Sequence, residues 1–164
     1  MSLVGFNPRN HPQQKPKSFV DDRATTPEVF DPIHARFGFT VDAAASKENA
    51  KLKRYWTTDD DGLSQNWEGE RVWCNPPYSC IRPWVEKALS QKKGLVVMLL
   101  PANRTEQAWW QDLIEPTRDD MSGNLRTEFV RGRIRFIAKG DNEIKPNARP
   151  PFGCVLVIFG ARNL

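Results

Sequence analysis

The sequence is poor in the residues that build disulfide frameworks and metal centres. Its 164 residues include three cysteines, which form no CxxC pair, and two histidines. An odd number of thiols with this spacing is typical of free cysteines in a reducing compartment, and ligands this sparse do not predict a zinc site. We therefore expect no bound metal and a cytoplasmic location.

The sequence also lacks a segment that could cross or target a membrane. Its longest apolar run, Leu95 to Leu100, is far shorter than the roughly 20 residues that span a bilayer. Met1 to Gly5 have neither the basic start nor the long apolar core of a secretory signal. The residues present are 39% hydrophobic and 27% charged, with a net charge of +4. This composition predicts a globular protein and fits a polyanionic partner.

Prolines and apolar spacing divide the chain into an arm and one domain. Residues 1–18 contain Pro8, Pro12 and Pro16 and few apolar side chains, which predicts a flexible N-terminal arm. Residues 19–164 are enough for a single domain with a buried core.

Within this domain the pattern predicts strands that alternate with helices. The run 95–100 is continuously apolar, which is typical of a strand buried on both faces of a parallel sheet. The alternation predicts an α/β fold with a mostly parallel sheet, helices on both faces, and ligands at the carboxyl ends of the strands. The expected helices are 26–36, 81–92 and 105–114, and the expected strands are 39–41, 71–74, 95–100, 129–137 and 155–159.

The most informative motif is the N-P-P-Y tetrapeptide at 75–78, which directly follows the apolar run 72–74. Two adjacent prolines cannot continue a sheet ladder, so the strand must stop in a stiff turn. The Asn75 amide oxygen, the proline carbonyls and the Tyr78 ring then suit a planar group with an exocyclic amine, such as a nucleobase. Asp42 also ends an expected strand, so it would face the same crevice.

At these residues the sequence resembles a known family, the small phage-type DNA N6-adenine methyltransferases of the Dam family, which use S-adenosylmethionine. The likeness covers residues 26–160 and implies a compact, Rossmann-like class I methyltransferase domain over 19–164. Its most specific element is N-P-P-Y between a strand and a helix. The other elements are T-P-E-V-F at 26–30, V-D-A-A-A-S at 41–46, D-G-L at 61–63 and G-R-I-R-F at 132–136.

The resemblance implies a set of residues that bind S-adenosylmethionine. An acid can accept hydrogen bonds from an amino group or an ammonium, small residues let the backbone approach a ligand, and a leucine can cover a ring face. The set is Thr26, Pro27 and Phe30 around the methionine end, Asp42, Ala43 and Ala44 in the turn after a strand, and Asp61 and Leu63 around the adenine.

The sequence departs from the usual methyltransferase pattern in two places. After Asp42 it has alanines where a glycine-rich F-x-G-x-G element is usual, which leaves the backbone less permissive. The segment 47–70 is too short for two complete strand–helix units, because each parallel crossover needs a dozen or so residues. We therefore expect one strand of the standard sheet to be missing or vestigial.

The catalytic role falls to Asn75, Pro76, Pro77 and Tyr78. We expect the Asn75 side-chain oxygen and the Pro76 carbonyl to bind the two hydrogens of an exocyclic amine, which turns the nitrogen lone pair toward the methyl donor. The adenine would be flipped out of duplex DNA, and Tyr78 would stack on it. The predicted reaction is methyl transfer to the N6 atom of adenine in DNA, with no membrane partner.

DNA contact is predicted for Arg131, Arg133 and Arg135, which alternate with apolar residues. On a strand this alternation gives one basic face and one apolar face, so the arginines either contact phosphates or form a solvated face. Lys51, Lys53 and Arg54 have the same two interpretations. Recognition of the target would come from loops such as 116–128 and 138–150. Trp84 and Trp109 fit apolar helix faces, so we expect both to pack in the core.

Two other functions remain open. The same N-P-P-Y chemistry serves methyltransferases that modify cytosine N4 or the glutamine side chains of proteins. The altered turn after Asp42 also fits a nucleic-acid-binding protein on a methyltransferase fold without catalysis. Methylation of DNA and binding of S-adenosylmethionine separate these possibilities.

Overall fold

Residues 23–138 and 152–164 are described in the computed structural model, so the predicted arm, 1–18, lies outside the described residues. The strands are β1 (Arg23–Thr25), β2 (Val41–Asp42), β3 (Arg71–Cys74), β4 (Leu95–Pro101), β5 (Leu125–Phe129), β6 (Phe136–Ala138) and β7 (Cys154–Phe159). The helices are α2 (Pro27–Phe37), α3 (Arg82–Leu89) and α4 (Ala108–Gln111), followed by a 3-10 turn, η2 (Ala161–Asn163).

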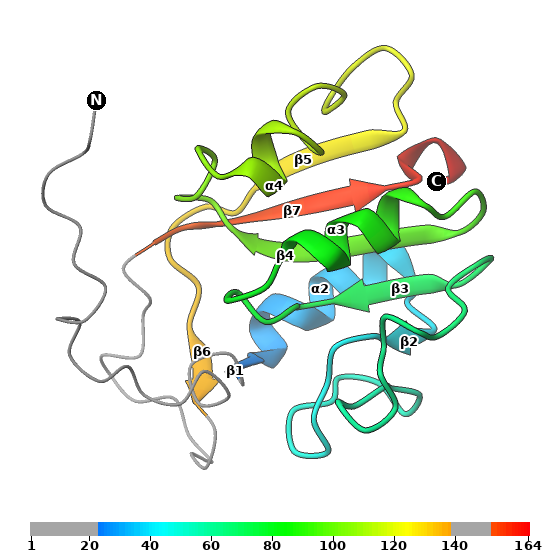
Figure 1. Ribbon diagram of the computed structural model, residues 1–164. Helices are drawn as coiled ribbons and strands as arrows, with labels where there is room; N and C mark the ends of the chain where they lie inside the picture. The colour runs from blue at the N-terminus through cyan, green and yellow to red at the C-terminus, as the bar shows by residue number, and fades with distance from the viewer. Residues whose placement is uncertain (1–22, 139–151) are drawn as a thin grey trace, which may run out of the picture.

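The main sheet has five strands in the order β2-β3-β4-β7-β5 (Figure 1). β2, β3 and β4 are parallel neighbours, whereas β7 runs antiparallel to both β4 and β5. β1 and β6 form a separate antiparallel pair. The expected mostly parallel, Rossmann-like sheet is therefore wrong, because the main sheet is mixed, with two parallel and two antiparallel strand pairs, and the separate pair is antiparallel as well.

The direction of β7 has a topological cause. A parallel neighbour of β5 would need a crossover that returns the chain to the opposite edge of the sheet, usually through a helix. Here β5 is followed by β6, which pairs with β1 beside the carboxyl ends of β3 and β4 (Figure 1). β7 then enters the sheet at the end where β3 and β4 finish, and it runs back antiparallel to its neighbours, β4 and β5.

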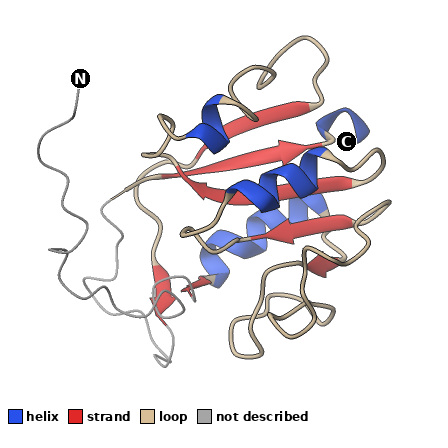
Figure 2. Cartoon of the chain, in the orientation of Figure 1, coloured by secondary structure: helices blue, strands red, loops and turns tan. Residues whose placement is uncertain are grey.

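The expected helical layers on both faces are not formed, because the helices are few and short (Figure 2). α2 packs Phe30 and Phe37 against one face of the sheet, whereas Val85 and Ala88 of α3 pack against the other. The helix expected over 105–114 is only the single turn of α4. Loops cover much of the remaining sheet surface.

Other local predictions are confirmed. α2 ends at Gly38, which has a left-handed φ of 61° that suits glycine. The apolar run becomes β4, which is buried along its whole length. The expected strand 129–137 is wrong as one element, since Gly132 has a φ of 74° and separates β5 from β6.

The segment between β2 and β3 forms a long loop instead of a strand–helix unit. Its one trace of a strand is a single parallel bridge between Asp42 and Tyr55. The Trp56 amide donates to the Asp42 carbonyl at 2.9 Å, and the Ala45 amide donates to the Trp56 carbonyl at 3.0 Å. The strand expected to be missing or vestigial is therefore reduced to this one bridge and the backbone bonds of the two residues beside Tyr55.

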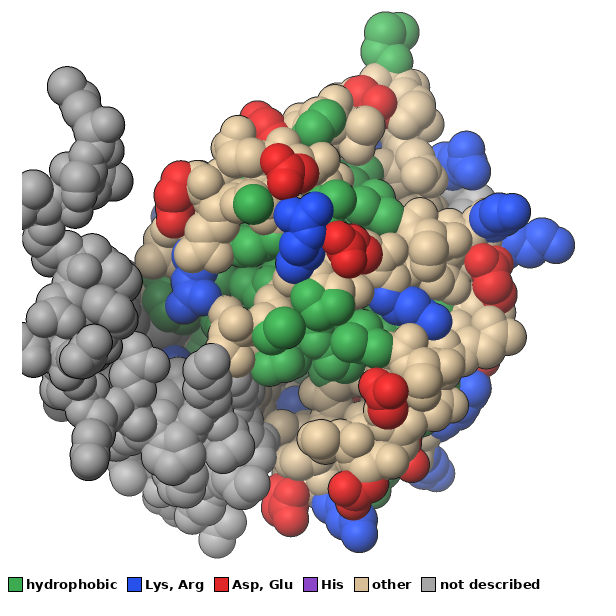
Figure 3. All heavy atoms as spheres, viewed as in Figure 1, with side chains coloured by type: hydrophobic (Ala, Val, Ile, Leu, Met, Phe, Trp, Pro, Cys, Tyr) green, Lys and Arg blue, Asp and Glu red, His purple; other side chains and the backbone are tan. Residues whose placement is uncertain are grey.

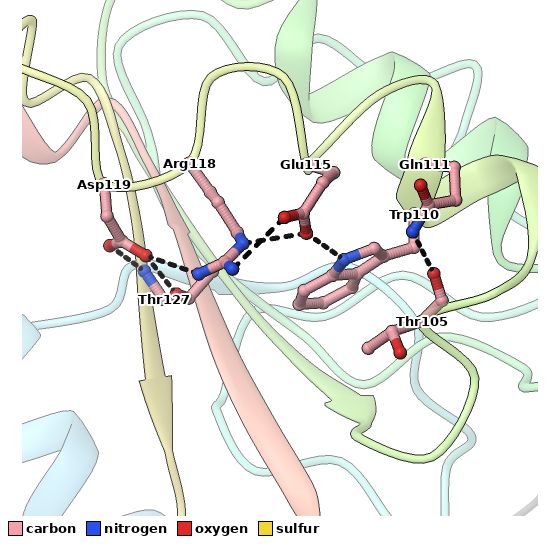
Figure 4. A network of polar contacts seen from close by, with 7 residues as sticks. All are labelled: Thr105, Trp110, Gln111, Glu115, Arg118, Asp119 and Thr127. Carbon is pink, nitrogen blue, oxygen red and sulfur yellow. Dashed lines mark hydrogen bonds and ion pairs between the residues drawn. The ribbon is translucent and has the colours of Figure 1, made fainter.

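A polar network holds the loop between α4 and β5 (Figure 4). The Trp110 indole donates to Glu115 at 2.6 Å, and Glu115 pairs with Arg118 at 2.9 Å. Asp119 accepts from both the backbone amide and the hydroxyl of Thr127, while its own amide donates to the Leu125 carbonyl. These bonds fix the loop along the outer edge of β5. A recognition role for 116–128 stays a prediction.

None of the helices in the two described segments is long and apolar enough to span a membrane. Within those segments, no group of three or more His, Cys, Asp or Glu side chains could hold a metal ion.

Candidate functional site

A cavity of about 390 Å³ opens beside the carboxyl ends of β2 and β3. A volume of this size suits a small organic ligand. Figure 3 shows the face that carries α3, where hydrophobic side chains gather above a hollow bordered by the loops that follow β2. The cavity is lined by Ala43, Ala44, Ala45, Ser46, Asn49, Trp56, Thr57, Thr58, Asp61, Gly62, Asn75, Pro77 and Trp84.

The proline corner reaches this cavity because β3 ends at Cys74, directly before it. Asn75 and Pro77 line the cavity together with Ala43 and Ala44, which follow β2. The parallel register of β2 and β3 pairs Asp42 with Trp73 and so brings the two turns to one edge. The structure therefore joins the tetrapeptide and the turn after Asp42, as the sequence predicts.

The Asn75 amide is held from its nitrogen end. Its Nδ2 donates to the Arg23 carbonyl at 3.2 Å and to the Thr25 hydroxyl at 3.4 Å. Both bonds use the NH₂ end of the amide, so Oδ1 is the end turned away from Arg23 and Thr25.

Tyr78 lies beside the cavity and does not line it. Its hydroxyl donates to the Leu99 carbonyl at 3.1 Å, and its ring lies 6.1 Å from the Phe152 ring. Arg104 donates to the Tyr78 carbonyl at 2.7 Å. Burial raises the pKa of the Tyr78 phenol well above its ordinary value, so this group stays neutral and acts as a tethered aromatic ring.

Asp42 is a buried carboxylate behind the cavity. It is 3% exposed and accepts a hydrogen bond from the Lys51 amide at 3.0 Å. Burial raises its pKa to about 6, although the amides of Lys51 and Ala44 and the charge of Lys51 act in the opposite direction. Asp42 lines a much smaller hollow that it shares with Asn75. The Asp42 carboxylate is therefore close to the N-P-P-Y turn.

The loop after the vestigial strand closes the cavity through Gly62. A Cβ atom at this position would lie 2.2 Å from the Ala43 carbonyl oxygen and 3.3 Å from the Trp84 ring. Glycine is thus needed for the close approach of the loop to the alanine turn. The buried Trp67 indole donates to the Gly62 carbonyl at 2.9 Å and fixes this contact.

The three consecutive aspartates, Asp59, Asp60 and Asp61, have different surroundings. Asp61 lines the cavity and has a φ of 49°. Asp60 accepts from the Thr57 amide and hydroxyl, which lowers its pKa and marks it as a turn residue. Asp59 is exposed and does not line the cavity. Of the three, Asp61 is the one placed to meet a ligand.

Besides Asp42, four predicted cofactor residues do not line the cavity: Thr26, Pro27, Phe30 and Leu63. Thr26 is buried at the start of α2, which Pro27 begins. Phe30 packs edge-on against Trp73 at 5.3 Å, inside the core. Their contact with a ligand stays a prediction. Thr25, the residue just before them, contacts Asn75 instead.

Sequence reasoning missed two aromatic walls of the cavity. Trp56 and Trp84 both line it, and Trp67 lies between them with ring separations of 6.5 and 6.2 Å. Trp84 packs against the core as predicted but also contributes to the cavity wall. Its apolar spacing on a helix signalled packing alone, and nothing in the polar segment around Trp56 signalled a ligand.

Arg131, Arg133 and Arg135 are exposed. They lie on the coil between β5 and β6, not on a strand, and the alternation persists because Ile134 and Phe136 are buried. This coil passes the edge where β3 and β4 end (Figure 1). The coil that carries the arginines thus lies at the same end of the strands as the N-P-P-Y corner.

In the other basic cluster, which comprises Lys51, Lys53 and Arg54, two residues make contacts within the protein. Arg54 pairs with Glu70 at 2.6 Å and lies 5.5 Å from the Trp56 ring. Lys51 is half-buried beside Asp42, and desolvation lowers its pKa. These contacts favour a structural role for both residues.

The fold and the cavity define a class of protein, a domain with a mixed sheet and a cavity beside its N-P-P-Y turn. Within this class, the chain belongs to the DNA N-6-adenine-methyltransferase (Dam) family, whose sequence model matches residues 13–162. The resemblance seen in the sequence is thereby confirmed.

Two curated relatives carry the same name. The DNA N-6-adenine-methyltransferase of Escherichia phage T1 is 33% identical over 135 residues, which cover 73% of this chain and 55% of the relative. The enzyme of that name from Haemophilus phage HP1 is 36% identical over 125 residues, which cover 74% of this chain and 66% of the relative. The matched part of the chain therefore spans 55% and 66% of these two relatives.

Proposed function

We propose that this chain transfers a methyl group from S-adenosylmethionine to the N6 atom of adenine in DNA. Membership of the Dam family and the names of the two phage relatives support this activity. The observation that carries the proposal is the single cavity that joins Asn75 and Pro77 to Ala43, Ala44 and Asp61. The free thiols and a DNA substrate support a cytoplasmic activity, in the host cell if the chain is phage-encoded.

The residues around the cavity fit S-adenosylmethionine. Trp56 and Trp84 offer flat apolar surfaces for a ring, and the Asp61 carboxylate can accept from an amino group or a hydroxyl. The alanine turn and Gly62 leave room for a ligand to approach the backbone. When bound, S-adenosylmethionine supplies an electrophilic methyl group.

The tetrapeptide activates the target amine without a side-chain base. Asn75 Oδ1 and the Pro76 carbonyl accept the two N–H hydrogens, which concentrates the nitrogen lone pair on the side of the methyl donor. These oxygens also stabilise the positive charge that develops on the nitrogen. Fixed positions for both reactants supply a further part of the rate enhancement.

Duplex DNA contacts the edge of the sheet that carries this corner. Arg131, Arg133 and Arg135 contact phosphates, and the target adenine leaves the base stack to reach Asn75. Tyr78 presents its ring to the flipped base, for which stacking contributes about 1–3 kcal/mol. Its tethered hydroxyl keeps the ring in a fixed position.

The activity is tested with unmethylated DNA and S-adenosylmethionine labelled on the methyl group. After digestion to nucleosides, we expect label in N6-methyldeoxyadenosine. Label in N4-methyldeoxycytidine, or in protein alone, would contradict the adenine assignment. Calorimetry that shows DNA binding but no binding of S-adenosylmethionine would favour a non-catalytic protein.

Replacement of Asn75 by Ala tests the site within this assay. We expect turnover to be abolished, since the principal acceptor for the amine is lost, while calorimetry shows cofactor binding largely retained. The exposed Asp59→Asn variant, which does not line the cavity, is the control and should keep activity. Unchanged turnover of Asn75→Ala would remove the role given to the tetrapeptide.

A further inference from the structure

Strand β1 contributes no residue to the main cavity, yet it holds the most important side chain there. Both recorded partners of the Asn75 amide nitrogen, the Arg23 carbonyl and the Thr25 hydroxyl, belong to this three-residue strand. Thr25 is 1% exposed, so water does not compete for its hydroxyl.

The chemistry of these partners fixes the orientation of the amide. A backbone carbonyl only accepts hydrogen bonds, so only the NH₂ end of Asn75 can face Arg23. A threonine hydroxyl can both accept and donate, so Thr25 alone would tolerate either end. The Arg23 carbonyl is therefore the selective partner, and it leaves Oδ1 as the end available to the cavity.

β1 is itself held in place by β6. Arg23, Ala24 and Thr25 pair with Ala138, Ile137 and Phe136 in antiparallel register. An isolated two-stranded pair is marginally stable in water, so packing must support it. Phe136 provides this support, since it is 4% exposed in the core cluster that includes Phe30 and Trp73.

We propose that β1 is a positioning element that locks the Asn75 amide with its oxygen toward the target amine, and that it thereby requires an amide rather than a carboxylate at position 75. The inference rests on the proposed function. An aspartate at this position would place a carboxylate oxygen against the Arg23 carbonyl, which cannot donate. Thr25 is a positioning residue in this scheme and acts only through Asn75.

The first test removes the Thr25 hydroxyl and restores it. Thr25→Val should lower kcat about threefold to tenfold, the effect of one hydrogen bond, with KM for S-adenosylmethionine unchanged. Thr25→Ser should return kcat to the wild-type value. Thr40→Val is the matched control, since the Thr40 hydroxyl bonds to Glu70 and Arg71 at the opposite end of β3 and its loss should leave kcat unchanged.

The second test uses Asn75→Asp at saturating cofactor and DNA. Near pH 8 we expect kcat to fall about tenfold to a hundredfold, because the carboxylate opposes the Arg23 carbonyl. Protonation lets the carboxyl donate to that carbonyl, so the ratio of variant to wild-type kcat should rise as the pH falls. Arg23, Asp42 and Lys51 line the same small hollow and are present in both proteins, so the ratio isolates residue 75.

Each outcome decides one question. Wild-type kcat in Thr25→Val, failure of Thr25→Ser to restore it, or a pH-independent ratio for Asn75→Asp would overturn the positioning role. An altered cofactor KM with normal kcat would also overturn it, because it would mark Thr25 as part of the cavity wall. Absence of adenine methylation by the wild-type protein would instead refute the proposed function, independently of these variants.

Discussion

At the scale of single residues, the buried Asp42 carboxyl links the stability of the fold to the proposed ligand binding. Its buried carboxyl has a pKa of about 6, above the ordinary value of 3.8. The folded protein therefore binds this proton more tightly than the unfolded chain does. The group contributes stability below about pH 4, which is lost as the pH rises through about 6. A charged carboxylate kept at this cost is expected where a bound ligand compensates for it.

Asp42→Asn should separate the two effects. At pH 8 the variant should have a higher free energy of unfolding than the wild type, by up to about 3 kcal/mol, because the uncompensated charge is gone. The difference should vanish near pH 4 in urea unfolding curves. Calorimetry at pH 8 should show weaker binding of S-adenosylmethionine. A variant less stable than the wild type at pH 8 would contradict this account.

The sequence predicted several residues that line the cavity, but not the residues packed around them. Asn75, Pro77, Ala43, Ala44 and Asp61 line one cavity because strand ends and turns are encoded locally by prolines, small residues and polarity. The same local signals could not place the residues further out. Thr25 and Trp84 contact the site through pairings and packing that depend on the whole chain.

At the scale of elements, the cavity depends on one loop that lies against the alanine turn. Gly62 allows this contact, because any side chain there would meet the Ala43 carbonyl. The turn after Asp42 has no glycines, but Gly62 in the facing loop allows the close backbone contact instead. This contact could not be predicted from the sequence, since the loop carries no helix or strand periodicity.

Gly62→Ala should displace the loop and weaken binding of S-adenosylmethionine by about tenfold or more, the usual effect of overpacking by 1–3 kcal/mol. Gly153→Ala is a matched control, because a Cβ there meets nothing within 4 Å in the part of the chain that the structure describes, and no positive φ strains the backbone. Binding is measured by calorimetry and folding by circular dichroism. Equal affinities in the two variants would show that the loop does not shape the ligand site.

Strand and helix content was predictable where patterns were strong. The apolar run became β4, and the segment from Pro27 to Gly38 became α2 with its expected end. The strand expected over 129–137 failed because alternation survives in a coil whose side chains still point alternately in and out. Alternation reports which side chains are buried, and it does not report whether the backbone is paired.

At the scale of the whole molecule, the direction of β7 could not be read from its sequence. Cys154–Phe159 is buried throughout, a pattern that fits a central strand of either direction. Its direction is set by the edge at which the chain arrives after β6. The mixed sheet nevertheless keeps β2, β3 and β4 parallel, so the carboxyl edge that carries the site is preserved.

The basic coil along that edge should dominate binding to DNA. Replacement of Arg131, Arg133 and Arg135 by Gln should weaken binding and reduce the slope of log K against log salt by about 2.7, if each arginine neutralises one phosphate. Cofactor affinity should not change. The binding constants are measured by fluorescence anisotropy over a range of salt concentrations.

A matched triple variant uses arginines that already pair with carboxylates. Arg36, Arg54 and Arg82 contact Glu128, Glu70 and Glu86, respectively. Their replacement by Gln changes the net charge equally and should leave the salt slope nearly unaltered. Equal slopes for the two triple variants would show that total charge, and not the coil, determines DNA affinity.

The contact between Asp119 and β5 has a consequence for how molecules of this protein meet one another. β5 is the last strand of its sheet, and an exposed last strand offers free amides and carbonyls to a neighbouring chain. Asp119 occupies the Leu125 carbonyl and the Thr127 amide. Residue 119 thus covers part of the edge at which a second copy could add its own strand, and removal of its carboxylate, which frees the Thr127 amide, should show first as aggregation in concentrated solution.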